Sequence, residues 1–193
     1  EVIAERERCP VVYVPVGLLE WHGPHLPLGT DALDAETVAL RAAERSGGVV
    51  LPACYCGTDC ACAPQQLCDL GFGGDEWIVG MDFPRNALKS LYFCEEVFAL
   101  VLRAWLTLLA AQGYRLIVMI NGHGGENHIA VIERLSRELT ATAGARVVSF
   151  FAWATADGAL DVGHADAIET SRMLALSARS ITRRSMPGAM PPC

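Results

Sequence analysis

All five histidines of the chain lie in three short segments that also carry carboxylates. The segments are EWHGPHLPLGTD (20–31), NGHGGENH (121–128) and HADAIETS (164–171). Imidazole and carboxylate groups are the usual ligands of zinc, manganese and iron, and a carboxylate between two ions can bridge them. Two ions about 3.5–4 Å apart can polarise a carbonyl and lower the pKa of a bound water. The pattern therefore indicates a dispersed metal site with hydrolytic chemistry.

Some of these residues also have a purely structural interpretation. Glu20 and His22 fall on the same side of an extended chain, so both can reach one site. Asp31 can be a ligand, a helix cap, or both. Glu126 is either a ligand or a first-turn acid that favours the helix dipole. For His128 we expect a satisfied core or surface residue.

The elements that must position these residues alternate between strands and helices. Apolar runs bounded by glycine predict strands over 9–17, 47–55, 114–125 and 145–153. Apolar residues at helical spacing predict helices over 30–47, 87–113, 126–144 and 166–178. This order predicts one α/β domain over residues 1–193, with a mainly parallel sheet and helices on both faces. The segment 57–86 is expected to be irregular, as is the tail from about residue 180.

Composition narrows the classes of partner. The net charge is −7, and no run of lysine and arginine suggests a nucleic-acid surface. No uninterrupted apolar stretch reaches the roughly 20 residues that a membrane span needs. The N-terminal residues do not resemble a signal peptide, so we expect a cytoplasmic protein with no membrane or nucleic-acid partner.

Five of the eight cysteines cluster between Cys54 and Cys68. Their spacing lacks the paired C-x2-C knuckles of a structural zinc site. Reduced thiols are the default for a cytosolic protein. We therefore favour small apolar residues over a metal or redox role for this cluster.

The three histidine segments closely resemble the motifs of the creatininase (creatinine amidohydrolase) family, over residues of about 10–178. The resemblance implies an α/β hydrolase with two divalent metal ions (zinc, manganese or iron). It also implies a small-molecule substrate, a cyclic or linear amide, and assembly into homo-oligomers such as hexamers.

The resemblance assigns the metal ligands residue by residue. Glu20 and His22 match ligands to one ion each, and Asp31 matches the carboxylate that bridges the two ions. His123 matches the histidine that pairs with Glu20 on the same ion. Glu169 matches the glutamate of the terminal ETS, either as a ligand or as an acid that supports the ligands.

Further residues are implied around the ligands. His164 matches a histidine of proton transfer, and His25 belongs to the signature, where it orients Glu20 or substrate. Trp21 and Trp153 are either core aromatics or walls of the pocket over the metals. Glu126 is a further substrate-binding candidate, and either it or Glu169 completes the second metal site.

The chain also departs from the family pattern. Creatininase itself has a glutamate ligand two residues after the second-motif histidine, where this chain has Gly125. Many relatives read HAGE where this chain has HADA (164–167), and FPRN (83–86) replaces a usual GT after Phe-Pro. These differences predict a divergent member with its own substrate preference.

The sequence leaves three hypotheses for the function. The first is hydrolysis of a small cyclic amide, or of a related C–N bond, by a hydroxide bridging two divalent metals, with part of the pocket supplied by residues 57–86. The second uses the same site for hydrolytic C–C ring opening of a cyclic keto-sugar (an inosose). The third is a non-catalytic metal- or thiol-binding protein built around Cys54–Cys68.

Overall fold

A single parallel sheet forms the centre of the protein in the computed structural model. The structure describes residues 1–153 and 163–181; for residues 177–181 it describes only the helix backbone. The strand order is β2-β1-β4-β5, and the short β3 also pairs with β1. The strands are β1 (Val11–Gly17), β2 (Val49–Val50), β3 (Cys54–Tyr55), β4 (Leu116–Asn121) and β5 (Arg146–Phe151). All their pairings are parallel, so the predicted α/β class is confirmed.

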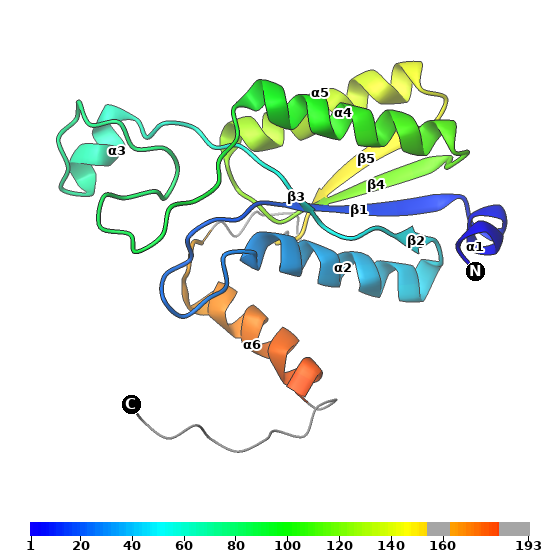
Figure 1. The fold of residues 1–193 in the computed structure, drawn as a ribbon, viewed down its shortest axis with the longest axis horizontal. Coiled ribbons are helices and arrows are strands. Elements are labelled where there is room, and N and C mark those ends of the chain that lie inside the picture. The colour runs from blue at the N-terminus through cyan, green and yellow to red at the C-terminus, as the bar shows by residue number, and fades with distance from the viewer. Residues whose placement is uncertain (154–162, 182–193) are drawn as a thin grey trace.

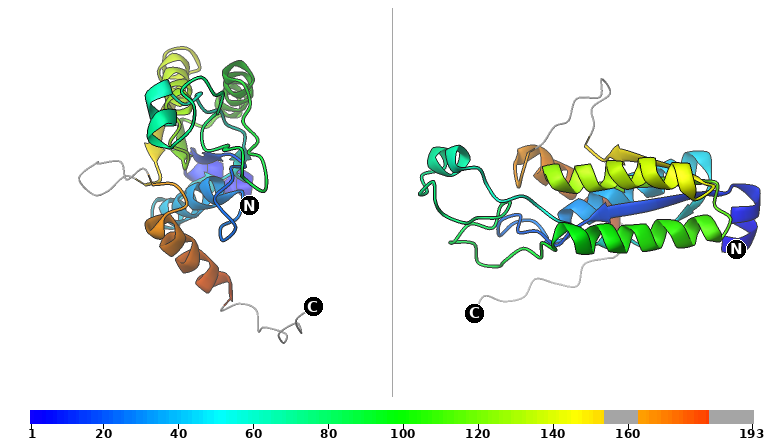
Figure 2. Two further views of the ribbon diagram at one scale, coloured as in Figure 1. Left: turned by 90° about the vertical axis from the view of Figure 1, so that its left-hand side faces the viewer. Right: turned by 90° about the horizontal axis from the view of Figure 1, so that it is seen from above.

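Helices cover both faces of this sheet (Figures 1 and 2). Helix α2 (Thr30–Ser46) lies on one face, and α4 (Glu95–Ala111) and α5 (Glu126–Thr142) lie on the other. Successive side chains of β1 point to opposite faces, so Val12 packs in the core under α4 and α5 while Tyr13 packs in the core under α2. Burial on both faces explains why the strands read as continuous apolar runs.

Three further helices lie around this layered centre. They are α1 (Val2–Arg8), α3 (Pro64–Asp69) and α6 (Ala167–Ile181). Helix α3 lies in an arm that extends beyond the carboxyl ends of the strands (Figure 2). No helix in the described ranges is long and apolar enough to cross a bilayer. The tail expected to be irregular lies outside the described residues from 182 onward.

The structure corrects three of the predicted elements. The helix expected over 87–113 begins only at Glu95, because the backbone before it binds other loops: the Leu91 N–H donates to Leu19 and the Phe93 N–H to Gly57. The strand expected over 47–55 is two short strands, separated by residues that include Pro52, which has no N–H for a ladder bond. The segment 57–86, expected to be irregular, contains α3.

The first turn of α2 packs directly against the carboxyl ends of β1 and β4. A Cβ at Gly17, the last residue of β1, would overlap the backbone of Ala32, and one at Gly122, just after β4, would overlap that of Asp31. Only glycine allows this approach of backbone to backbone. As a result, Asp31 lies between the ends of two adjacent strands.

We predict that Gly122→Ala destabilises the protein by about 3 kcal/mol, because the added Cβ has only rigid backbone to displace. Gly144→Ala is the contrast: its Cβ would enter open space, and its φ of 72° costs about 1 kcal/mol for a residue other than glycine. Urea unfolding of the two variants measures both values. Equal losses of stability would contradict the close packing at Gly122.

Candidate metal centre

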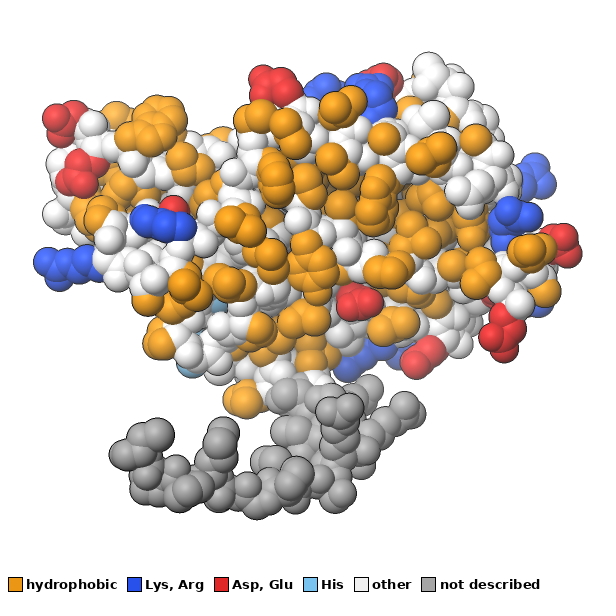
Figure 3. Space-filling view, viewed as in Figure 1, with side chains coloured by type: hydrophobic (Ala, Val, Ile, Leu, Met, Phe, Trp, Pro, Cys, Tyr) orange, Lys and Arg blue, Asp and Glu red, His pale blue; other side chains and the backbone are white. Residues whose placement is uncertain are grey.

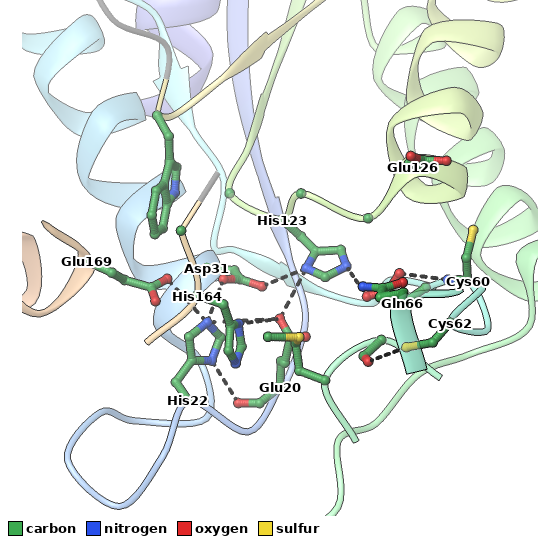
Figure 4. A pocket seen from close by; sticks show the side chains of 18 of the residues that line it. Glu20, His22, Asp31, Cys60, Cys62, Gln66, His123, Glu126, His164 and Glu169 are labelled. Atoms are coloured by element: carbon green, nitrogen blue, oxygen red, sulfur yellow. Dashed lines mark hydrogen bonds and ion pairs between the residues drawn. The ribbon is translucent and has the colours of Figure 1, made fainter. Parts of the chain in front are cut away.

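Loops that follow two neighbouring strands meet the first turns of two helices at one edge of the sheet (Figure 4). The loop after β1 carries Glu20 and His22, and α2 begins with Thr30 followed by Asp31. The loop after β4 carries His123, and the first turn of α6 carries Glu169. The carboxyl ends of parallel strands are where sites form in α/β sheets. The structure therefore brings these five sequence-predicted residues together.

The Asp31 carboxylate lies between two imidazole rings. Its Oδ1 is 3.2 Å from Nε2 of His22, and its Oδ2 is 3.2 Å from Nδ1 of His123. All three side chains are buried. Each oxygen of one carboxylate thus faces a different ring, which is the arrangement that a bridging ligand requires.

The first group of candidate ligands consists of His22, Asp31 and Glu169, all buried. Oε1 of Glu169 lies 3.2 Å from Nε2 of His22, the same nitrogen that faces Asp31. Nδ1 of His22 lies 3.0 Å from the backbone carbonyl of Glu20, to which it donates. This bond keeps one proton on Nδ1, so Nε2 either carries a second proton that it donates to the acids or, without that proton, offers its lone pair to a metal ion.

The second group consists of Glu20, His123 and Asp59. Oε2 of Glu20 is 3.2 Å from Nδ1 of His123, on the side of the ring that also faces Asp31. Oδ2 of Asp59 is 3.4 Å from the other ring nitrogen, Nε2. Tyr92 donates its hydroxyl proton to Oε1 of Glu20 and so holds this carboxylate in place.

Asp59 and Tyr92 are site residues that the sequence reasoning missed. Asp59 lies in the segment 57–86, which was expected to supply part of the pocket, but a single aspartate among glycine and cysteine forms no motif. Tyr92 lies in the stretch assigned wrongly to a helix. The length of the irregular segment was the available signal, and it identifies a region and not a residue.

The histidines and carboxylates of the cluster shift one another's pKa values. Burial disfavours the charge on His22, but the hydrogen bonds that His22 donates to the Asp31 and Glu169 carboxylates outweigh the burial and raise the pKa of His22 to about 10. Burial likewise opposes the charge on His123, and the carboxylates around it raise its pKa well above the usual value. The two rings in turn lower the pKa of Asp31 against its burial. A metal ion entering the cluster must displace these protons, so metal affinity rises with pH.

The charge of the cavity also fits divalent metal ions. The cavity measures about 430 Å³, and no lysine or arginine is among the described residues that line it. Glu20, Asp31 and Glu169 are nonetheless only 1–2% exposed. Carboxylates buried this close together need positive charge, which only the histidine protons or bound cations can provide here. The donor set of imidazole and carboxylate suits zinc, manganese or iron.

His164 lies beside these two groups and forms a third candidate group with Glu20 and His22, and one of its ring nitrogens is already hydrogen-bonded. Its Nε2 lies 2.8 Å from the backbone carbonyl of Trp21, to which it donates. Its Nδ1 lies 3.9 Å from Oε2 of Glu20, and its ring centre is 4.3 Å from that of His22. The Nδ1 lone pair therefore faces the cavity, where it can accept a proton.

The four expected substrate-binding residues have different positions. Trp153 is buried and lines the cavity, with the Arg172 guanidinium 4.7 Å from its ring centre. Glu126 is exposed at the rim and belongs to neither ligand group (Figure 4). His25 is exposed and binds Thr170, and Trp21 contributes its carbonyl to His164. Neither His25 nor Trp21 is among the described residues that line the cavity, so their substrate-binding role stays a prediction.

His128 is buried and fully paired. Its Nε2 donates to Asn121 over 3.1 Å, its Nδ1 accepts from the Thr58 N–H, and its ring stacks on Phe98. Burial and the nearby His123 charge lower its pKa well below the usual value, so the ring is neutral. The structural interpretation of His128 is confirmed.

The cysteine cluster shows no metal-binding geometry. None of the candidate ligand groups found in the described ranges contains a cysteine. Cys54 and Cys56 are buried, and Cys60 and Cys62 line the cavity. The hypothesis of a thiol-based metal site therefore has no geometric support.

The arrangement of these motifs agrees with a match to a known family. A family model described as "Creatininase: Creatinine amidohydrolase" matches residues 1–69 and 79–192. The chain belongs to the creatininase family. The predicted resemblance is thus confirmed over most of its length.

Individual members of the creatininase family give the degree of similarity. A creatinine amidohydrolase of Pseudomonas putida is 31% identical to this chain over 129 residues. The match covers 67% of this chain and 43% of that relative, so it spans less than half of the relative's length. The structure of a Glu-to-Gln mutant creatininase complexed with creatine is 27% identical, with a TM-score of 0.64, over 97% of this chain and 75% of that one. A Zn-Zn form of such a mutant has 27% identity and a TM-score of 0.62, over 100% and 75% of the two chains.

Proposed function

We propose that this creatininase-family chain is a metal-dependent hydrolase that opens a small cyclic amide or hydrolyses a related C–N bond. The observation that carries the proposal is the buried Asp31 carboxylate, which presents one oxygen to His22 and the other to His123. Family membership and the solved Zn-Zn form of a relative support the same conclusion.

We assign the candidate ligands to two ions on the basis of these contacts. His22, Asp31 and Glu169 would hold one ion, and Glu20, Asp31 and His123 would hold the other. Three protein donors on each ion leave positions open for water and substrate, as in catalytic zinc sites. Two divalent ions supply polarisation of a carbonyl and a lowered pKa for a water molecule. Glu169, and not the exposed Glu126, completes the site.

The side chains around the ligands have separable tasks. His164 holds its own proton on Nε2 against the Trp21 carbonyl, so Nδ1 can take a proton at the cavity and return it to the leaving nitrogen. Tyr92 keeps Glu20 in one orientation. Trp153 provides a flat apolar wall against which a small ring can pack.

The charge of the cavity selects the class of substrate. Five acids line it, and no lysine or arginine does so in the part of the chain that the structure describes; the acids are Glu20, Asp31, Asp59, Glu126 and Glu169. Two divalent ions would balance four of these five carboxylates, and no other fixed cation lines the described cavity, so a phosphate or carboxylate on the substrate would find no further counter-charge there. We therefore infer an uncharged or cationic substrate. A panel of cyclic amides and cyclic keto-sugars, scored for released amine or released acid, tests which bond is cleaved.

We predict that Asp31→Asn loses at least one of two bound metal ions, because the amide has no charge and only one acceptor atom. Metal analysis after dialysis against limiting zinc measures the loss. Asp34→Asn is the matched control: it changes the charge equally one turn later in α2, where Asp34 pairs with Arg172. Full metal content in Asp31→Asn would contradict the bridging role.

We predict that His164→Gln lowers kcat about 100- to 10,000-fold while both metal ions stay bound, because in the proposed mechanism this side chain moves a proton and other residues hold the ions. Steady-state kinetics on the substrate found by the panel, with metal analysis, measures both. His25→Gln serves as the control, since His25 is exposed and does not line the cavity. Unchanged kcat in His164→Gln would exclude the proton-transfer role.

We also propose that the chain assembles with copies of itself through α4. Figure 3 shows apolar side chains spread over this face, and several of the exposed ones belong to α4 and the segment before it: Leu88, Leu91, Phe93, Val97, Leu100 and Leu108. Apolar surface that gathers on one face is typical of an interface.

We predict that Leu100→Glu, at a side chain that is 66% exposed, lowers the mass of the assembly in light scattering. The introduced charge would have to lose its water in the interface. Val2→Glu, on the equally exposed α1, is the control and leaves the mass unchanged. A wild-type chain that is already monomeric at micromolar concentration would refute the proposal.

A further inference from the structure

The histidines at the metal centre use their two ring nitrogens differently. For His22 and His164, one nitrogen faces the cluster and the other donates to a backbone carbonyl. Nδ1 of His123 faces Glu20 and Asp31, but its Nε2 is buried and has no hydrogen-bond partner among the described residues. Among the described residues, His123 therefore lacks the hydrogen bond to a backbone carbonyl, here called the anchor, that orients the other two rings.

The carboxylate of Asp59 is in position to provide this anchor. Its Oδ2 lies 3.4 Å from Nε2 of His123, at ion-pair distance though without hydrogen-bond geometry. Its Oδ1 accepts the Cys60 N–H over 2.7 Å, which fixes the orientation of the carboxylate. The second oxygen thus remains available to the ring.

The backbone around Asp59 is also held to helix α5. The Thr58 N–H donates to Nδ1 of His128 over 3.4 Å, and the Asn127 amide donates to the Thr58 hydroxyl over 3.3 Å. Both partners belong to α5, which begins three residues after His123. The same helix therefore ties the loop of Asp59 to the loop of His123.

Gly125 leaves the space that this pair needs. A Cβ at this position would lie 2.7 Å from Nε2 of His123 and 3.0 Å from Oδ1 of Asp59. Any side chain there would press on both members of the pair. The glycine is thus required for the His123–Asp59 contact at its present distance.

We infer that Asp59 is a positioning residue that accepts a hydrogen bond from the Nε2–H of His123, keeps the ring proton on Nε2 and so presents the Nδ1 lone pair to a metal ion beside Glu20 and Asp31. A carboxylate behind a metal-binding histidine sets its tautomer and raises its basicity. The inference rests on the two-ion site of the proposed function. Asp59 faces the opposite nitrogen from Glu20 and Asp31, so it acts through the ring.

Zinc affinity of the full chain provides the first test, with zinc alone as the probe. Competition with a chromogenic chelator at fixed pH should show binding weakened about 10- to 100-fold in Asp59→Ala. Asp59→Asn and Asp69→Asn form a matched pair, because each removes one negative charge from the same arm. Asp69 is the control position: it is exposed, and its side chain bonds only Gln65 among the described residues. Asp69→Asn should bind as the wild type does, and Asp59→Asn should bind more weakly.

The tautomer of His123 provides a readout that a general loss of structure would not produce. In the zinc-loaded wild type, ¹⁵N NMR of the imidazoles should show the proton of His123 on Nε2 and the metal on Nδ1. In Asp59→Ala the Nε2 proton should exchange with water much faster, because its acceptor is gone.

Two results would overturn the inference. One is wild-type zinc affinity in Asp59→Ala, and the other is a metal ion on Nε2 of His123, which would make Asp59 a direct ligand. Either result leaves the two-ion site in place if the wild type still binds two zinc ions. A wild type that binds no zinc would instead overturn both this inference and the proposed function.

Discussion

The buried carboxylate of Asp31 is the interaction on which the rest of the site depends. A buried anion is costly unless positive groups lie close to it, and His22 and His123 lie 3.2 Å from its two oxygens. These contacts require the ends of β1 and β4 to lie side by side with the first turn of α2 against them. Gly17 and Gly122 permit that approach, so two backbone positions without side chains determine where the carboxylate can be.

The acids of the centre come from distant parts of the chain. No lysine or arginine lines the cavity around them in the described residues. Glu169 reaches His22 from α6, and Asp59 reaches His123 from the arm. Gly125 has no side chain, and the space that this leaves lies beside His123 and Asp59.

The fold class and most elements could be predicted because the sheet is buried on both faces, which gives strands such as β1 an unbroken apolar run. The start of α4 could not, because residues 87–94 have helix-compatible side chains but bond to loops that the local sequence does not specify. Glu20, His22, Asp31, His123, His164 and Glu169 could be selected because histidine and carboxylate cluster in motifs. Asp59 and Tyr92 belong to no motif, and only their contacts with His123 and Glu20 place them at the centre.

By itself the sequence determined the residue types and the order of elements, with candidate metal-ligand side chains directly after strands. Periodicity and motif spacing are local properties, so a single chain reveals them. Tertiary structure alone decided that Glu169 and not Glu126 joins His22, that His25 and Trp21 lie off the cavity, and that Asp59 stands behind His123. These are contacts between segments far apart in the chain, and they depend on packing geometry that no local pattern encodes.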